Sequence, residues 1–214
     1  MTTTVPIAPI VDVAPAAPSD EVIARAVEVL SRGGVIAFPT DTLYGIGCQM
    51  DHRQAIDRIQ AMRGFDSAKR PLTLLLPDVG ELPRYAIVGE PGFRIVTRIF
   101  PGPYCAEMLA SPGAPTSFVH KDRRTIGVRI PDTAFCARLL WALRRPMLTA
   151  TAKARDGGAL ATAQDIAREY GGDLDLIVDG GELSGPPSTV VSLVDDWVTV
   201  LREGKGPPGR LLAE

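Results

Sequence analysis

Short apolar segments alternate with amphipathic helices along most of this chain, and this alternation constrains the fold more than any other feature of the sequence. The segments "PLTLLL" (71–76) and "TIGVRI" (125–130) are short and apolar enough to be buried strands, whereas "TAFCARLLWALRR" (133–145) repeats its apolar residues at helical spacing. Helices interleaved with buried strands are typical of an α/β architecture. We therefore predict an α/β fold.

The same pattern predicts the individual elements. Ser19 is a favourable N-cap for a first helix, which Gly33 and Gly34 end. The last two strands are joined by Asp195 and Asp196, which indicates a hairpin and therefore a mixed sheet. We expect helices near 20–32, 52–62, 80–87, 91–100, 133–145 and 162–171, and strands near 35–39, 71–76, 125–130, 146–151, 174–181, 188–194 and 197–204.

The first 18 residues differ from the rest of the chain. They consist mainly of Thr, Pro, Ala and Val, with four prolines and one charge, and they show no helical period. Such a segment has no apolar face to bury, so we expect a flexible arm over 1–18. The remaining residues, 19–214, show no internal boundary and are expected to form a single domain.

Composition narrows the functional classes. No apolar run approaches the ~20 residues of a membrane span, and no secretory signal is visible. The three cysteines and two histidines are too few and too scattered for a disulfide framework or a zinc site. We interpret the cysteines as buried thiols and the protein as cytoplasmic. The net charge of −2 means that any polyanion must bind to a local basic surface.

Polar residues follow the strand at 35–39, in "GGVIAFPTDTLYGIG" (33–47). Thr40, Asp41 and Thr42 come at the strand end, followed by Tyr44, which we expect to be exposed. Ligands of α/β sheets bind at strand ends, so this loop is a candidate binding site. The alternative is a capped turn, because Thr and Asp readily hydrogen-bond to nearby backbone groups.

Cations mark two further candidate sites. "MRGFDSAKR" (62–70) contains Arg63, Lys69 and Arg70, which suit a triphosphate but equally suit a solvated loop; it is not a Walker A sequence. Arg129 lies within an apolar strand, where an unpaired guanidinium is costly. It therefore either forms a buried salt bridge or binds an anionic ligand group.

Three weaker motifs complete the candidates, and none resembles a catalytic triad. "TATAK" (149–153) places Lys153 after a threonine-rich strand, and "SGPPSTVV" (184–191) places Ser188 and Thr189 at a strand start. "HKDRR" (120–124) is a basic patch that is either a solvated loop or a polyanion contact. We assign no role to His52 or His120, and no catalytic residue and no metal ligand is identified.

Taken together, these stretches resemble the YrdC/YciO family. The motifs "GGVIAFPTDTLYGIG", "KRPLTLLL", "PGPY", "TIGVRIPD", "PMLTATAK", "SGPPSTVVSL" and "VLREG" follow one another in the order of that family and cover roughly residues 20–206. The resemblance implies a twisted open sheet with a basic concave face. It also implies a threonylcarbamoyl-adenylate synthase of tRNA modification, which joins L-threonine, bicarbonate and ATP, with Mg²⁺ on the nucleotide, and releases pyrophosphate.

The resemblance also implies roles for individual residues. Thr40, Arg129 and Ser188 match the family's L-threonine side. On the ATP side, Arg63 matches the second member of the K-x-R motif, Thr151 the serine of S-x-N, and Arg202 the arginine of R-E-G. Lys69 and Lys153 are further candidates for the ATP side, because either could supply phosphate-facing charge.

The sequence departs from the synthase pattern at the phosphate side. Ala61 stands where the family has the lysine of K-x-R, Lys153 where it has the asparagine of S-x-N, and Cys105 where a threonine is usual. These changes resemble the YciO branch. The alternative function is therefore a non-catalytic protein that binds a nucleotide or double-stranded RNA. For RNA, we expect at most weak, salt-sensitive binding to a duplex or tRNA through a basic face.

Overall fold

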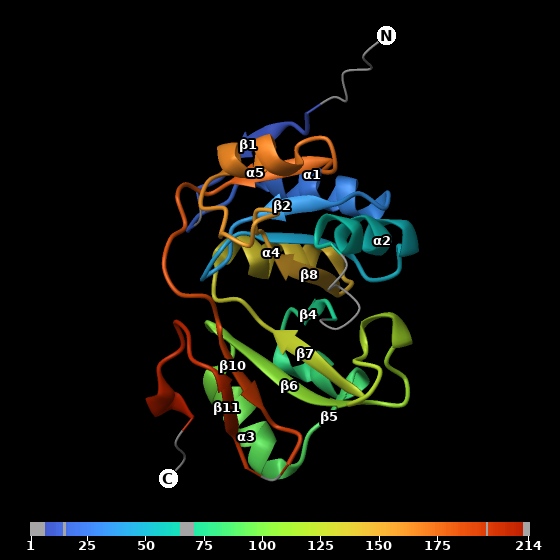
Figure 1. The fold of residues 1–214 in the computed structure, drawn as a ribbon, viewed down its shortest axis with the longest axis vertical. Coiled ribbons are helices and arrows are strands. Elements are labelled where there is room, and N and C mark those ends of the chain that lie inside the picture. Colours follow the sequence, from blue (N-terminus) through green and yellow to red (C-terminus); the bar gives the residue numbers. More distant parts are fainter. Residues whose placement is uncertain (1–6, 15, 65–70, 196, 212–214) are drawn as a thin grey trace.

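The computed structural model describes residues 7–14, 16–64, 71–195 and 197–211. Its strands form one mixed, open sheet in the order β1-β9-β2-β3-β8-β4-β7-β6-β10-β11, with β5 paired to β6, and the sheet runs from β1 at the top of Figure 1 to β11 at the bottom. The strands are β1 (Ile10–Asp12), β2 (Ile36–Phe38), β3 (Gly45–Gln49), β4 (Thr73–Leu75), β5 (Ala86–Ile87), β6 (Tyr104–Ala110), β7 (Thr125–Arg129), β8 (Met147–Thr151), β9 (Leu176–Asp179), β10 (Thr189–Ser192) and β11 (Thr199–Arg202).

Capping residues define where several of the helices begin. As predicted, Ser19 accepts a hydrogen bond from the Val22 amide at the start of the first helix, and Thr133 and Thr162 cap two later helices in the same way. The α-helices are α1 (Asp20–Ser31), α2 (Arg53–Met62), α3 (Glu90–Ile99), α4 (Ala134–Leu143) and α5 (Ala163–Tyr170), and short 3₁₀ helices span Val79–Arg84, Thr116–Phe118 and Pro208–Arg210.

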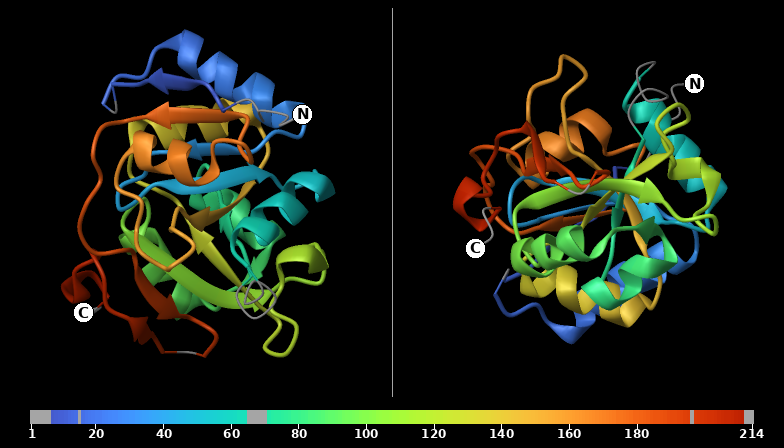
Figure 2. Two further views of the ribbon diagram at one scale, coloured as in Figure 1. Left: turned by 45° about the horizontal axis from the view of Figure 1, so that its top comes forward. Right: turned by 90° about the horizontal axis from the view of Figure 1, so that it is seen from below.

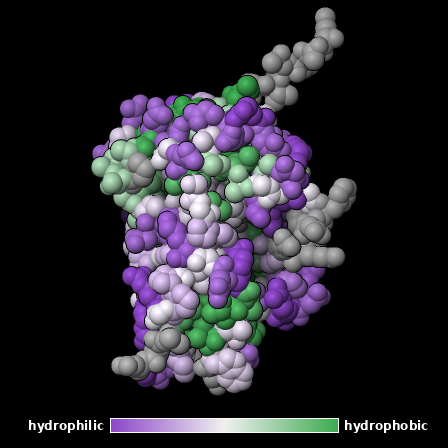
Figure 3. Space-filling view, turned by 60° about the vertical axis from the view of Figure 1, so that its left-hand side comes forward, coloured by the Kyte–Doolittle hydropathy of each residue, from purple (hydrophilic) through white to green (hydrophobic). Residues whose placement is uncertain are grey.

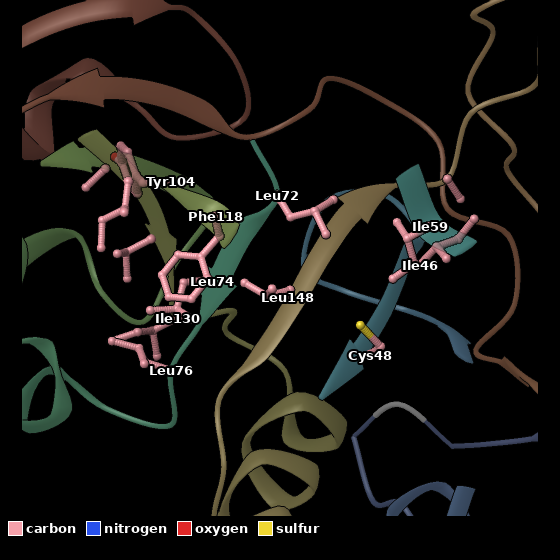
Figure 4. Close-up of a cluster of buried hydrophobic side chains, with 14 of the residues drawn as sticks. Ile46, Cys48, Ile59, Leu72, Leu74, Leu76, Tyr104, Phe118, Ile130 and Leu148 are labelled. Atoms are coloured by element: carbon pink, nitrogen blue, oxygen red, sulfur yellow. The ribbon is translucent and has the colours of Figure 1, made fainter. Parts of the chain in front are cut away.

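Two hydrophobic cores fix the helices on the sheet. α1 and α4 pack together (Figure 2) over a core that includes Leu30, Phe38 and Phe135. The larger core joins residues of α2, α3 and α5 to the central strands. Leu74 and Leu148 pair across β4 and β8 within it, as Figure 4 shows. Burial of each such side chain contributes roughly 1.5–3 kcal/mol.

The structure confirms the mixed α/β architecture and corrects some elements. The closing hairpin is present, since β10 and β11 pair antiparallel. Four strands, β1, β3, β5 and β6, were not predicted. The short helix expected near 80–87 is present as a 3₁₀ helix over Val79–Arg84, but its expected end is a strand, Ala86–Ile87. Pro83 cannot donate a backbone hydrogen bond within an α-helix.

The expectation of a flexible arm over 1–18 is wrong for the segment that the structure describes. Ile10–Asp12 form the edge strand β1, which pairs parallel with β9. Ala8 and Val13 are buried on either side of it. The backbone pairing with β9 and two buried side chains, rather than a helical period, anchor this segment. Residues 1–6 and 15 lie outside the described part.

Removal of residues 1–13 is therefore expected to lower the free energy of unfolding by about 2 kcal/mol or more. The truncation loses the buried Val13 side chain and the hydrogen bonds of β1. Chemical denaturation of the full chain and the truncated chain measures the difference. An unchanged midpoint and slope would show that β1 adds nothing to stability.

The surface carries exposed apolar side chains at the lower end of the molecule. Trp197, Val200 and Leu201 of the β10–β11 region are all exposed. In Figure 3, hydrophobic side chains gather in the lower half of the face shown, the half that holds β10, β11 and α3 in Figure 1. Among the described residues, no helix is both long and apolar enough to cross a membrane.

Candidate functional site

A cavity of about 640 Å³ lies over the central strands and brings together the candidate residues of the sequence. Of the eight residues proposed for the two sides of the site, seven line this cavity, and the eighth, Lys69, lies outside the described residues. The seven are Thr40, Arg63, Arg129, Thr151, Lys153, Ser188 and Arg202. Segments more than 160 residues apart in sequence therefore contribute to one site.

Small side chains on alternate positions leave room for the cavity. On β7, Gly127 faces the cavity while Val128 faces the core, and on β6, Cys105 faces the cavity while Ala106 faces the core. A Cβ atom at Gly127 would lie 3.3 Å from the Cys105 sulfur. Because strand side chains alternate between faces, this pattern packs one face and keeps the other open.

Hydroxyl groups gather at one end of the cavity. Thr40 Oγ1 donates to the Leu43 carbonyl at 2.7 Å and accepts from the Thr42 amide at 3.1 Å, so the loop is a capped turn. Thr42 Oγ1 also lies 3.5 Å from the Oγ of Ser188, the residue that directly precedes β10. The turn and the ligand interpretations of this loop are therefore compatible: the turn fixes the hydroxyls, and the hydroxyls border the cavity.

Arg129 is held by a buried ion pair at the same end. Its Nη2 lies 2.6 Å from Asp41 Oδ1, and the two side chains are only 11% and 9% exposed. Asp41 Oδ2 also accepts from the Asp132 amide, and the Asp41 carbonyl accepts from Lys205 Nζ. Arg129 Nε is buried and makes no hydrogen bond with any part of the chain that the structure describes. The guanidinium is thus a structural partner of Asp41 that also borders the cavity.

Cationic side chains predominate on the cavity wall. Arg63 follows α2, Lys153 follows β8, and Arg155 lies in the adjoining loop, and all three line the cavity. Arg202 of β11 donates to the Ser188 carbonyl at 2.8 Å and so lies next to the hydroxyl end. With one carboxylate among the described lining residues, the cavity carries a net positive charge, which favours an anionic ligand.

The structure adds lining residues that the sequence analysis did not identify. Glu107 of β6 is the carboxylate of the cavity wall, and it pairs with Arg123 at 3.1 Å. Arg123 belongs to the basic patch 120–124, so that patch reaches the cavity through one residue. Arg155 and Tyr170 also line the cavity. The alternation in "YCAEMLA" (104–110), which the sequence analysis did not use, is the signal that could have indicated β6 and Glu107. Nothing in the sequence indicates Tyr170.

Tyr44 is buried, which corrects the expectation that it is exposed. Its hydroxyl donates to the Gly181 carbonyl at 2.7 Å and accepts from the Gly180 amide at 3.0 Å. Burial raises the pKa of Tyr44 to about 12. The tyrosine therefore ties the first loop to the segment after β9 and remains protonated at neutral pH.

Two of the three cysteines lie in hydrophobic cores, whereas Cys105 lies beside polar and charged residues of the cavity wall. Cys48 and Cys136 are buried, while Cys105 is partly exposed and borders the cavity. Burial raises the pKa of the Cys48 and Cys136 thiols to about 12, and it raises the pKa of Cys105 as well. The thiols are therefore protonated at neutral pH and are poor nucleophiles.

Comparison with known proteins identifies the relatives of this chain. The Sua5/yciO/yrdC family, described as "telomere recombination", matches residues 28–204. An uncharacterized protein of Haemophilus influenzae is 35% identical over 90% of this chain and 93% of its own, and the uncharacterized protein YciO of Escherichia coli is 34% identical over 88% and 92%. A putative threonylcarbamoyl-AMP synthase of Methanocaldococcus jannaschii is 30% identical over 86% of each chain.

Solved structures show the same relationships. The crystal structure of E. coli YciO matches 96% of this chain and 100% of its own, with a TM-score of 0.89 and 32% identity. The structure of P. abyssi Sua5 complexed with L-threonine matches 92% of this chain and 57% of its own, with a TM-score of 0.80 and 26% identity. The chain belongs to the Sua5/YciO/YrdC family, has the YrdC-like fold and matches the YciO branch.

Proposed function

We propose that this protein is a threonylcarbamoyl-adenylate-synthase-like nucleotidyltransferase that uses ATP, L-threonine and bicarbonate, in the pathway of tRNA threonylcarbamoyladenosine modification. The observation that carries the proposal is the convergence of the seven candidate residues on one cationic cavity. Relatives named threonylcarbamoyl-AMP synthase and a Sua5 structure with L-threonine support the choice of substrates.

The proposed roles follow from the two ends of the cavity. Thr40 and Ser188 offer hydroxyls to the amino acid, and Arg129 offers its guanidinium to the carboxylate. Arg63, Lys153 and Arg202 face the nucleotide, with Thr151 as a neutral hydrogen-bonding group and Lys69 proposed beside them. A carbamate oxygen of threonine forms the bond to the α-phosphorus as the bond to pyrophosphate breaks. A preformed carbamate carries its own negative charge, so this step needs no general base.

Magnesium is proposed to enter with the nucleotide. Mg²⁺ is commonly bound through substrate phosphates and one or two carboxylates. Within the described residues there is no group of three or more metal-ligating side chains, and Glu107 is the carboxylate on the cavity wall. A single carboxylate fits a magnesium ion that is bound mainly by the triphosphate. Such an ion would neutralise charge on the leaving pyrophosphate. The protein's own contribution is the arrangement of cations around the phosphates.

Ala61 is expected to limit the rate, because it lies on the cavity wall where the synthases place a lysine. Ala61→Lys is expected to raise pyrophosphate release about 10-fold or more, on the scale of one added charge facing a developing anion. Gln60→Lys is the matched control, since Gln60 precedes it on α2 without lining the cavity. Equal rates for the wild type and Ala61→Lys would show that this position does not limit the chemistry.

Ala61, which stands where the family has a lysine, also favours a second candidate function, a protein that binds a nucleotide or RNA without catalysis. RNA would meet Lys121, Arg123 and Arg124, of which Arg123 borders the cavity. We expect such binding to be weak and to fall steeply with salt. Binding that is tight at physiological salt and survives alanine at all three positions would favour RNA as the main ligand.

Thermal denaturation with millimolar ligands tests whether the cavity binds the proposed substrates. A ligand that binds only the folded state raises the midpoint, by an amount that grows with its concentration above Kd. We expect ATP with Mg²⁺ and L-threonine each to raise the midpoint, whereas L-valine, which lacks the hydroxyl, raises it less. No shift with either substrate would contradict the proposal.

A further inference from the structure

Tyr170, the last residue of α5, connects two segments of the cavity wall through its hydroxyl. The hydroxyl donates to the Lys153 carbonyl at 2.9 Å and lies 3.3 Å from the Met62 carbonyl, and the residue is only 4% exposed. Met62 ends α2 and directly precedes Arg63. One phenol thus lies between the segment that carries Arg63 and the segment that carries Lys153.

The ring of Tyr170 contacts a third cation. The guanidinium of Arg155 lies over the ring, 5.3 Å from its centroid, a geometry that is attractive for a cation over an aromatic face. Arg155 also pairs with Glu169 at 3.4 Å and with Asp173 at 3.8 Å. Its side chain is 65% exposed, so these ion pairs are weak and leave the guanidinium able to contact a second anion.

The Tyr170 hydroxyl is one of several contacts at the base of the loop that carries Lys153 and Arg155; the Ala152 amide also donates to the Tyr44 carbonyl, and the Arg155 amide to Glu169 Oε1. Lys153 and Ala159 form an antiparallel bridge, and the Ala154 amide donates to the Gly158 carbonyl at 2.8 Å, so residues 153–159 make a tight hairpin. Gly157 has a φ of +97°, which a residue with a side chain rarely adopts. The hairpin is otherwise exposed at its tip. Contacts that fix the base of the hairpin reduce the conformational entropy that its cations lose when they order around a ligand.

We propose that Tyr170 is a positioning residue that holds the cations of the 153–159 hairpin and of Arg63 around a polyphosphate, and that Arg155 is a further ligand of that polyphosphate. The identity of the polyphosphate as the triphosphate of ATP rests on the proposed function; the cationic site itself does not. Burial raises the pKa of Tyr170, so its hydroxyl keeps the proton that it donates.

Tyr170→Phe isolates the hydroxyl, because the ring and its contact with Arg155 remain. The variant is expected to raise the Kd of inorganic pyrophosphate and of ATP about 5-fold, the scale of one hydrogen bond, while the Kd of L-threonine stays the same. Tyr85→Phe is the matched control: Tyr85 is also buried under an arginine, with Arg84 5.8 Å from its ring centroid, but it does not line the cavity. Calorimetric titration measures all three ligands.

Arg155→Met tests the proposed ligand directly. We expect about a 10-fold weaker binding of pyrophosphate, again with unchanged L-threonine binding, because one charge facing the phosphates is lost. Arg155→Lys is expected to recover part of the affinity, since it keeps the charge without the planar guanidinium. Arg84→Met is the control for loss of an exposed arginine stacked on a tyrosine. Hydrogen exchange of the peptide covering 153–159 should increase in Tyr170→Phe and not in Tyr85→Phe.

The outcomes separate this inference from the proposed function. Pyrophosphate affinity that is equal in the wild type and Tyr170→Phe, with only a lower melting temperature, would overturn the positioning role and leave the proposed function intact. Weaker pyrophosphate binding in both variants, in a protein that never releases pyrophosphate from ATP and L-threonine, would support the positioning role and contradict the proposed function. A wild type that binds neither pyrophosphate nor ATP would overturn both.

Discussion

Arg129→Met is expected to weaken L-threonine binding by about 2–4 kcal/mol, the scale for truncating one half of a buried charge pair. The methionine keeps most of the apolar stem of the side chain but removes the guanidinium that borders the hydroxyl end of the cavity. Stability should also fall, by about 3–5 kcal/mol, because Asp41 then remains buried without its 2.6 Å partner. Calorimetric titration and chemical denaturation measure the two effects separately.

Variants of Asp41 separate the binding role of Arg129 from its structural role. Asp41→Asn with Arg129→Met removes both charges, so the double variant should regain much of the lost stability while L-threonine binding stays weak. Asp41→Asn alone keeps the guanidinium and should retain more of the binding. If the double variant recovers both stability and L-threonine affinity, Arg129 belongs only to the salt bridge.

Gly204→Ala is expected to lower the free energy of unfolding by more than about 3 kcal/mol. A Cβ atom at Gly204 would lie 2.2 Å from the Pro187 carbonyl oxygen and 2.6 Å from the Ser188 carbonyl carbon. Both are backbone atoms at the start of β10, so no side-chain rotation can relieve the overlap. The neighbouring Lys205 amide donates to the Pro187 carbonyl at 2.8 Å, which holds the two segments together.

The same change is expected to disturb the site, because the displaced backbone carries Ser188. L-threonine binding should therefore weaken even at temperatures where the variant is folded. Gly209→Ala is the matched control, since a Cβ atom there would meet nothing within 4 Å. Normal stability in Gly204→Ala would show that the close approach of the two segments is not required by the fold.

The sequence predicts those parts of the fold that local patterns encode. The cap at Ser19 and the helical period of 133–145 were sufficient for α1 and α4. The strand Gly45–Gln49 was not predicted because its two glycines resemble a loop. Their small size makes room for the core side chain Phe38, which a Cβ atom at Gly45 or Gly47 would meet at 3.2 Å or 3.1 Å. β1 was not predicted because it is only three residues long and pairs with β9, which lies more than 160 residues away in the sequence.

The site was predictable where a residue is unusual for its surroundings, as Arg129 is within an apolar strand. The sequence left two interpretations of that arginine open, and the structure shows the ion pair with Asp41 together with a position on the cavity. Tyr170 was not predictable, because its role depends on carbonyls of residues 62 and 153, which only the folded chain brings together.

Release of pyrophosphate from ATP is the measurement that tests the central claim most directly. The purified chain with ATP, Mg²⁺ and bicarbonate should release pyrophosphate only when L-threonine is added, and Arg129→Met should lose most of this release at subsaturating L-threonine. Release that is absent under all conditions, or that is the same with and without L-threonine, would contradict the account.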